Sequence, residues 1–244
     1  NKNMEQEQQP GTARFGNFIN YYSFNPAEKR LDLIPRDILI KYGYRPGQNN
    51  PTLVLDIGCN AGDLTASLRQ HLFTETPAEN LKILGVDIDP VLIERSRSNH
   101  TDPCLTFLAA DLMDHQIRSE VIEQWLLTNQ KQAFDLVTCF SVTLWIHINH
   151  GDDGLKEFLR HISSISKFLI IEPQPWKCYR TAMRRMKRNS CSAFPKFESL
   201  QWRSDVDQKI SAFLSQECGL TLKETLGTTD WDRKLLLFER ESKS

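Results

Sequence analysis

Short apolar runs alternate along the chain with stretches in which apolar residues recur every three or four positions. The apolar runs predict strands that are buried on both faces, at residues 53–57, 81–86, 105–109, 134–140 and 168–171. The intervening stretches predict helices over residues 28–40, 64–72, 91–97, 117–127 and 154–165. Strands that alternate with helices in this way are typical of an α/β fold with a parallel sheet.

The C-terminal part of the chain follows a different pattern. A predicted helix around residues 206–214 is followed by two predicted strands, 220–226 and 235–240, with no helix between them. Two strands joined this directly can pair antiparallel. Residues 1–14 are polar and are predicted to form a disordered tail, and the length of residues 15–244 suits a single domain.

The turn after the first strand carries the clearest chemical signal. Gly58 and Gly62 enclose Asn60, so the backbone can turn sharply and bring its amides close to a ligand. The dinucleotide pattern G-x-G-x-x-G is absent, and Asp56, two residues before the first glycine, would repel a pyrophosphate. A carboxylate there suits a cationic amine, and D-x-G-x-x-x-G looks like the first motif of methyltransferases that use S-adenosylmethionine (SAM). The alternative is an ordinary strand–turn–helix unit of an α/β protein.

Acidic residues follow the second and third predicted strands as well. Asp87 can accept hydrogen bonds from both hydroxyls of a ribose, which is a common role for an acid at this place. The alternative is a helix cap, a role that Asp89 before Pro90 can fill by itself. Asp111 can accept a hydrogen bond from an adenine amino group.

An aromatic segment precedes the first strand. Residues 15–24 read FGNFINYYSF, which is far richer in aromatic side chains than the rest of the chain. Two interpretations remain open at this point. The segment is either a flap that covers the core, or a lid whose Tyr21, Tyr22 and Phe24 face a ligand.

Composition limits the cellular locations and the kinds of binding site that the protein can have. The six cysteines are scattered without C-x-x-C pairs or Cys/His metal spacing, which predicts reduced thiols, a cytosolic or nuclear location and no metal site. The polar N-terminus predicts no signal peptide, and no apolar run reaches the ~18 residues of a membrane span. Because the net charge is only −1, any site for an anion must come from local clustering.

Two further stretches bear on the substrate. Residues 141–151, SVTLWIHINHG, follow the fourth strand and place Trp145, His147 and His150 where ligands gather in open α/β sheets. Residues 173–197 hold no acidic residue and seven basic ones: Lys177, Arg180, Arg184, Arg185, Lys187, Arg188 and Lys196. A solvated helix face usually mixes both signs of charge, so this stretch predicts an anionic polymer as a partner, either RNA or DNA.

The chain from Arg14 to Arg240 resembles the bicoid-interacting-3 family of RNA methyltransferases. The resemblance rests on five segments: GNFINYYSFNPAEKRL, LDIGCNAGDL, VDID, WIHINHGDDGL and EPQPWKCYR. It implies a Rossmann-like fold with a seven-stranded, mostly parallel sheet that ends in an antiparallel hairpin. It also implies SAM as the methyl donor, with S-adenosylhomocysteine (SAH) as the product.

Roles for individual residues come from the same resemblance. It places Tyr21 beside the transferred methyl group and Arg30 on the carboxylate of SAM. The methionine part is assigned to Asp56, Gly58 and Asn60, the ribose to Asp87, and the adenine to Asp111 with Leu112. Ile88 and Phe140 are further candidate contacts of the cofactor.

The short branch of this family methylates the 5′-monophosphate ends of small RNAs, and the resemblance implies such a substrate, including tRNA for histidine and microRNA precursors. A monomer in the cytoplasm is expected. One alternative is the activity of the larger snRNA-capping enzymes, which act on the γ-phosphate but typically have a lysine where this chain has Leu144. Two competing interpretations are a catalytically silent RNA-binding protein of the same fold and a SAM enzyme acting on a small molecule or a protein. A nicotinamide-dependent oxidoreductase is disfavoured by Asp56 and by the missing third glycine.

The chemistry of a terminal phosphate suits these residues. Its second pKa is ~6, so it is mostly dianionic at neutral pH and needs no strong general base. The candidate residues at the reacting groups, Tyr21 and His147, are therefore predicted to position the substrate, with a neutral His147 as one hydrogen-bond donor. Further contacts to the substrate are predicted from Trp145, His150, Lys177, Arg180, Arg184 and Arg185.

Overall fold

The computed structural model describes residues 12–18, 20–45, 50–72, 80–188 and 192–241. Seven strands form one sheet in the order β3-β2-β1-β4-β5-β7-β6. The strands are β1 (Thr52–Ile57), β2 (Leu81–Asp87), β3 (Leu105–Ala109), β4 (Phe134–Phe140), β5 (Ser166–Glu172), β6 (Leu220–Thr228) and β7 (Lys234–Arg240). Strands β1 to β5 run parallel, whereas β7 is antiparallel to both β5 and β6, which confirms the predicted fold class.

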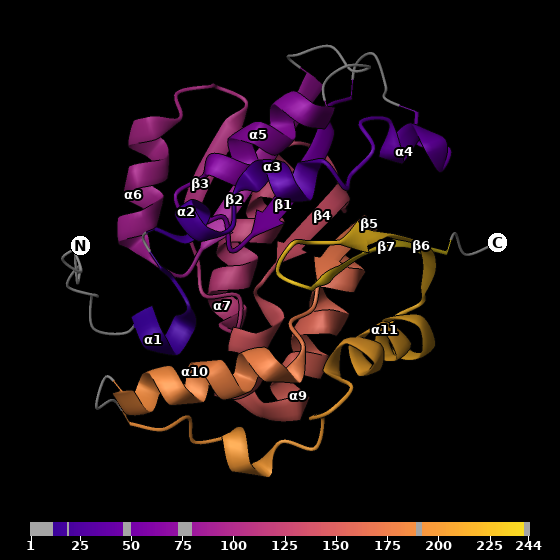
Figure 1. Cartoon of the computed structure of the whole chain (residues 1–244). Helices are drawn as coiled ribbons and strands as arrows, with labels where there is room; N and C mark the ends of the chain where they lie inside the picture. Colours follow the sequence, from indigo (N-terminus) through magenta and orange to yellow (C-terminus); the bar gives the residue numbers. More distant parts are fainter. Residues whose placement is uncertain (1–11, 19, 46–49, 73–79, 189–191, 242–244) are drawn as a thin grey trace.

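Helices cover both faces of the sheet (Figure 1). The helices before β4 are α1 (Thr12–Phe15), α2 (Tyr21–Phe24), α3 (Ala27–Leu31), α4 (Ile38–Lys41), α5 (Asp63–His71), α6 (Pro90–Asn99), α7 (His115–Arg118) and α8 (Gln124–Thr128). Those after β4 are α9 (Thr143–Ser164), α10 (Trp176–Arg188) and α11 (Val206–Glu217). Figure 1 shows α3 and α5 on one side of the sheet, α9 and α11 on the other, and α10 crossing the end of the molecule beside α1.

The two helical layers pack on two separate cores because side chains alternate along each strand. Leu53 and Leu55 of β1 belong to a core shared with α9 and α11, whereas Val54 belongs to a core shared with α3, α4 and α5. All six residues of β1 are buried, as the unbroken apolar pattern predicts for a strand covered on both faces. The carboxyl ends of β1, β2, β4 and β5 therefore meet between the layers, at the point where the strand order reverses.

Several predicted helices have different limits in the structure. The single helix predicted over residues 28–40 is wrong, since α3 ends at Leu31 and α4 begins at Ile38. Pro35 lies between them, and a proline inside a helix removes a hydrogen bond and clashes with the preceding turn. The helix predicted over 117–127 is built from α7, a π-helical turn (Ser119–Glu123) and α8. Helix α9 begins at Thr143, well before the helix predicted over 154–165, and has a break at Gly151 (φ 78°).

Two other predictions concern the ends of the chain and its setting. Most of the predicted tail lies outside the described residues, but Thr12–Arg14 belong to α1. No helix within the described ranges combines the length and the apolar character needed to cross a bilayer.

Candidate active site

The turn between β1 and α5 has the geometry that its glycines predict. Gly58 has φ 75° and Gly62 has φ 86°, and a Cβ atom on Gly58 would overlap the side chain of Val142. The amides of Gly58 and Cys59 both donate to the carbonyl of Val86, at 2.8 and 3.0 Å, which ties the turn to β2. Both glycines are therefore required by backbone conformation, and Gly58 also by close packing.

Two carboxylates lie at the strand ends beside this turn. Asp56 is buried and accepts hydrogen bonds from the hydroxyls of Thr65 (2.6 Å) and Thr138 (2.7 Å). Asp87 is also buried and accepts from the backbone amides of Asn60 (2.9 Å) and Asp89 (3.0 Å). Burial raises the pKa of Asp56 above its ordinary value and raises that of Asp87 to about 6.

The helix-capping role that competes with ribose binding belongs to the neighbouring acid. Asp89 precedes α6, and its side chain accepts from the amide of Val91 at 2.8 Å. Its second carboxylate oxygen accepts from the side chain of Asn17 at 2.6 Å. Asp87 is thus not needed as a cap, which leaves its carboxylate as the acidic group at the end of β2 that can serve a ligand.

The aromatic segment at residues 15–24 lies over the glycine turn and is called the lid below, without residue 19, which is not described. The side-chain amide of Asn60 donates to the carbonyl of Phe18 (3.0 Å), and the Tyr22 hydroxyl donates to the carbonyl of Cys59 (3.3 Å). At its other end the lid packs on α9, where Phe18 meets the ring of Trp145 edge-on at 6.1 Å. A Cβ atom on Gly16 would overlap the indole of Trp145, so the lid can approach this closely only with glycine there.

Of the three lid aromatics that were candidates to face a ligand, two point inward. The hydroxyl of Tyr21 donates to Ser141 Oγ at 2.8 Å, and Tyr22 reaches Cys59 as described. Phe24 instead is 80 % exposed at the end of α2. Tyr21 and Tyr22 therefore remain candidates to face a ligand, whereas Phe24 points away from the turn.

A buried ion pair lies beneath the lid. Arg30 and Glu172 are both 0 % exposed, and Arg30 donates to Glu172 Oε2 from Nε (3.1 Å) and from Nη2 (2.8 Å). The Nη2 group also donates to the hydroxyls of Tyr21 (2.7 Å) and Ser141 (3.0 Å). Burial acts to lower the pKa of Arg30, but Glu172 and Tyr21 outweigh it and hold the pKa above its ordinary value. The guanidinium is therefore charged at every accessible pH.

The hairpin between β6 and β7 completes this cluster with two residues that sequence reasoning missed. The indole of Trp231 donates to Glu172 Oε1 at 2.7 Å, and its ring lies 4.8 Å from the guanidinium of Arg30. Arg233 donates to Ser141 Oγ and lies 3.9 Å from Glu172 Oε1. No sequence signal marks them, because charged and aromatic residues are ordinary in a hairpin loop.

The candidates after β4 are spread over helix α9, and the structure does not bring them together. Trp145 lies against the lid, whereas His150 is exposed. His147 is 0 % exposed, and its ring nitrogens contact the Tyr179 hydroxyl (2.9 Å) and Asp152 Oδ1 (3.3 Å). Burial lowers the pKa of His147, which favours the expected neutral ring. With both nitrogens engaged inside the protein, His147 links α9 to α10, and its predicted role at the substrate stays a prediction.

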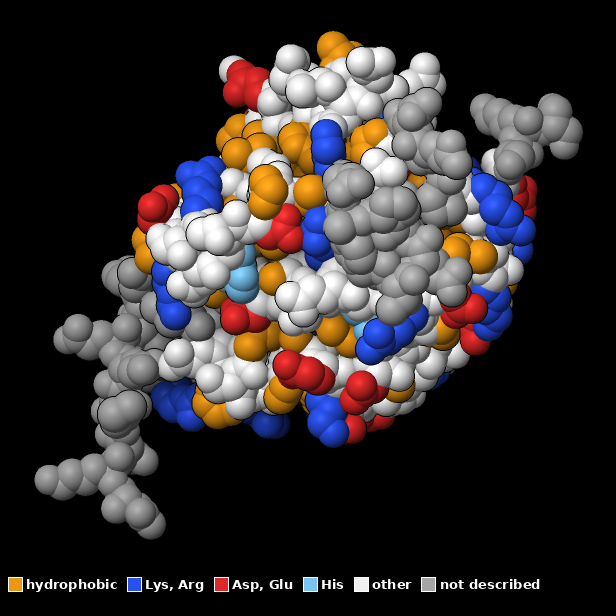
Figure 2. All heavy atoms as spheres, turned by 90° about the horizontal axis from the view of Figure 1, so that it is seen from above, with side chains coloured by type: hydrophobic (Ala, Val, Ile, Leu, Met, Phe, Trp, Pro, Cys, Tyr) orange, Lys and Arg blue, Asp and Glu red, His pale blue; other side chains and the backbone are white. Residues whose placement is uncertain are grey.

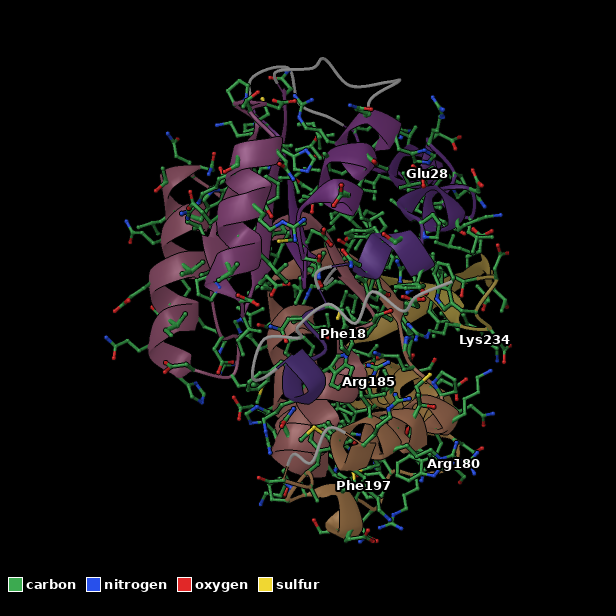
Figure 3. All side chains as sticks on the ribbon, turned by 60° about the vertical axis from the view of Figure 1, so that its left-hand side comes forward. Phe18, Glu28, Arg180, Arg185, Phe197 and Lys234 are labelled. Atoms are coloured by element: carbon green, nitrogen blue, oxygen red, sulfur yellow. The ribbon has the colours of Figure 1, made fainter. Side chains whose placement is uncertain are left out.

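The basic stretch forms helix α10 as predicted, with Tyr179, Ala182 and Met186 buried. Arg180 and Arg184 are exposed, while Lys177 pairs with Asp232 at 2.5 Å. Arg185 lies over the ring of Phe18 in the lid, 4.3 Å from its centroid, and burial followed by the neighbouring Arg188 lowers its pKa. Figure 3 shows Phe18 and Arg185 together, with Arg180 farther along the helix.

The residues predicted to contact the adenine, and those predicted at the ends of β2 and β4, differ in how far they are buried. Asp111 is partly exposed and accepts from the amide of Met113 at 2.8 Å, and Leu112 is buried. Phe140 is buried with the Arg30 guanidinium 5.5 Å from its ring centroid, whereas Ile88 is 37 % exposed. In the described part of the chain, no group of three or more His, Cys, Asp or Glu residues is arranged to hold a metal ion.

The solved structures that align with this fold include methyltransferases. The N-methyltransferase NodS of Bradyrhizobium japonicum, solved with SAH, aligns with a TM-score of 0.58 at 16 % identity over 94 % of this chain and 95 % of that one. The magnesium protoporphyrin IX methyltransferase of Synechocystis, also solved with SAH, aligns with a TM-score of 0.54 at 19 % identity over 88 % and 84 %. At these identities the likeness concerns the fold alone.

Sequence comparisons identify the family, which the likeness of fold does not. Residues 134–240 match the family model described as bicoid-interacting protein 3, and residues 55–167 match a methyltransferase domain. The RNA 5′-monophosphate methyltransferase of Mus musculus is 44 % identical over 94 % of this chain and 84 % of its own length. The pre-miRNA 5′-monophosphate methyltransferase of Danio rerio is 40 % identical over 98 % and 97 %. With its methyltransferase fold and these relatives, the chain belongs to the bicoid-interacting protein 3 family of methyltransferases, in the group of the RNA 5′-monophosphate methyltransferases.

Proposed function

We propose that this protein methylates the 5′-monophosphate end of small RNAs with SAM as the methyl donor. The observation that carries the proposal is the buried cluster under the lid, where Asp56, Asp87 and Arg30 gather beside the basic helix α10. The names of the aligned relatives from mouse and zebrafish support the substrate. tRNA for histidine and microRNA precursors are the small RNAs to test first, and the zebrafish relative is named for the second of these.

The charged groups of the buried cluster under the lid suit the parts of SAM. When bound, SAM supplies a methyl group attached to a cationic sulfur. Asp56 would hold the amine and Asp87 the ribose hydroxyls. Arg30 would hold the carboxylate, because its Nη1 group has no hydrogen-bond partner among the described residues. A buried donor without a partner is costly, so an arriving anion would be bound strongly there.

The protein's own residues would act by positioning and by exclusion of water. A phosphate dianion is already a nucleophile at neutral pH, so no side chain has to remove a proton. Tyr21 and Tyr22 lie over the turn through their contacts with Ser141 and Cys59. A site covered in this way would strengthen the electrostatic contacts inside it and keep the reacting groups aligned.

Helix α10 is the proposed track for the body of the RNA. It contains no acidic residue, and its exposed side carries Arg180, Arg184, Lys187 and Arg188. The face of the molecule shown in Figure 2, in contrast, carries acidic and basic side chains interspersed with one another. A stretch of one sign of charge binds the nucleic-acid backbone by releasing counterions.

Charge reversal on this helix gives a direct prediction. Arg184→Glu is expected to weaken RNA binding and to lower the slope of log affinity against log salt concentration by about 1. Arg184 suits the test because it is exposed, unlike Arg185. The control is Arg36→Glu, an exposed arginine next to α4, which Figure 1 shows far from α10. Equal salt slopes for both variants and the unmodified protein would make the basic stretch an ordinary solvated face.

The whole proposal is tested by mass spectrometry on one small RNA prepared with a 5′-monophosphate and with a 5′-triphosphate. After incubation with protein and SAM, a mass increase of one or two methyl groups is expected on the monophosphate form. The triphosphate form is expected to stay unmodified, because the side chain of Leu144, where capping enzymes have lysine, is buried and offers no charge. Methylation of the triphosphate alone would contradict the proposal.

A further inference from the structure

Ion pairs hold the loop that joins β6 to β7 against both α3 and α10. Lys29 of α3 pairs with Asp230 at 3.0 Å, and Lys177 of α10 pairs with Asp232 at 2.5 Å. The alternate residues, Trp231 and Arg233, point inward to Glu172 and Ser141. The antiparallel pairing of β7 with β5 fixes this position, because it carries the loop past the carboxyl end of β5.

Hydrogen-bond donors outnumber acceptors at the centre of this cluster. Ser141 Oγ is approached by three donors, from Tyr21, Arg30 and Arg233, and it donates its own proton to Glu172. A hydroxyl oxygen has only two lone pairs, so the three donors cannot all be satisfied by it at once. In addition, Arg30 Nη1 and Arg233 Nε are buried and have no hydrogen-bond partner in the described part of the chain. The cluster therefore lacks an acceptor that a ligand could supply.

Arg233 also lies where the two halves of the reaction have to meet. On one side it shares Ser141 with Tyr21, the lid residue assigned to the methyl group. On the other side its Nη2 group is 3.8 Å from the sulfur of Cys178, in the first turn of α10. The end of an RNA that follows α10 and reaches the methyl donor would have to pass this guanidinium.

We propose that Arg233 binds the 5′-terminal phosphate of the RNA, an inference that rests on the function proposed above. The guanidinium would exchange Ser141 Oγ for a phosphate oxygen, and Ser141 would then serve Tyr21 and Arg30 alone. A planar guanidinium can hold two phosphate oxygens at once, which orients the third. Because arginine keeps its proton at neutral pH, this contact aligns the phosphate without protonating the nucleophile.

The test measures binding of two RNAs that differ only in a 5′-phosphate or a 5′-hydroxyl, by fluorescence anisotropy with SAH present. The unmodified protein is expected to prefer the 5′-phosphate RNA. In Arg233→Gln this preference should fall by about 10- to 100-fold, the value of one charge-assisted hydrogen-bonded contact. Affinities for SAH and for the 5′-hydroxyl RNA should stay unchanged. Arg233→Lys is the conservative control: it keeps the positive charge but not the planar guanidinium, and it should retain part of the preference.

The matched control is Lys234→Gln, which removes the same charge from the next residue, whose side chain is exposed and labelled in Figure 3. It should leave the preference intact. The inference is overturned if Arg233→Gln keeps the full preference, if the unmodified protein has none, or if Arg233→Gln loses SAH and both RNAs equally. A third outcome separates the two proposals. If the unmodified protein methylates no RNA, but prefers the 5′-phosphate RNA and Arg233→Gln removes that preference, the proposed function fails and the phosphate site stands.

Discussion

Glu172→Gln is expected to lower the free energy of unfolding by about 3–5 kcal/mol, the usual cost of removing one partner from a buried ion pair. The glutamate is 0 % exposed and accepts hydrogen bonds from Arg30, Ser141 and Trp231. Glutamine has nearly the same shape, but its amide group cannot balance the charge of Arg30, and its NH2 group would face other donors. The guanidinium would then be left as an uncompensated charge in the interior.

Urea unfolding followed by circular dichroism measures this loss. The matched control is Glu224→Gln, which removes the same charge from a pair between Glu224 and Lys41 whose side chains are 32 % and 45 % exposed. That variant should unfold close to the unmodified protein, since exposed ion pairs contribute little. A midpoint for Glu172→Gln that coincides with the control would show that the buried pair does not stabilise the fold.

Asp87→Asn is expected to weaken SAM binding by about 10- to 100-fold, since a charged acceptor for two ribose hydroxyls becomes a neutral one. The pKa of Asp87 is raised by burial to about 6, so the carboxylate loses its charge as the pH falls through that value. Binding to the unmodified protein should therefore weaken between pH 7 and pH 5.5. The variant should bind weakly at both pH values, because its asparagine does not titrate. Calorimetric titration with SAH at several pH values checks both statements.

At neutral pH the same substitution has two opposing effects on stability: it removes a buried charge, but its NH2 group faces the amide of Asn60 or Asp89 and loses one hydrogen bond. Because its pKa is raised, folded Asp87 keeps its proton up to about pH 6, whereas in the unfolded chain it releases it near the ordinary value of 3.8. The folded state thus binds more protons in this window, and the free energy of unfolding falls as the pH rises through it, by up to about 3 kcal/mol. Asparagine does not titrate, so the variant should escape this loss.

Unchanged SAH affinity in Asp87→Asn would contradict the assignment of Asp87 to the cofactor. Asp153→Asn is the matched control, because its side chain is fully exposed on α9. It should change neither the affinity for SAH nor the unfolding curve. The pair of variants separates a carboxylate that serves a ligand from one that only faces solvent.

Local pattern was sufficient for the alternation of strands and helices and for the glycine turn with its two carboxylates. The unbroken apolar run at β1 predicted a strand covered on both faces, and its alternation places Leu53 and Val54 in different cores. The glycine turn was equally readable, because a positive φ at Gly58 and Gly62 is a property of a few adjacent residues. Asp56 and Asp87 followed from it, since the carboxyl ends of neighbouring parallel strands must meet at one edge of the sheet.

The predictions that were wrong, or that the structure left unsupported, depended on contacts across the sheet. The stretch after β4 was predicted to place side chains at a ligand, but most of it belongs to α9, and packing against Tyr179 buries His147. A histidine in a helix has the same local signature whether it faces a crevice or another helix. The helix limits near Pro35 are an exception, because the proline between α3 and α4 is a local signal that can be read from the sequence.

The sequence by itself therefore determined the alternation of strands and helices along the chain, the glycine turn after β1 and the basic character of α10. Each of these depends on residues that are close together in the chain and repeat with a fixed period. Only the tertiary structure decided that Arg30, Ser141, Glu172 and Arg233 form one polar cluster. Their meeting requires β7 to pair antiparallel with β5, and no local preference of these four residues encodes a pairing between segments so far apart.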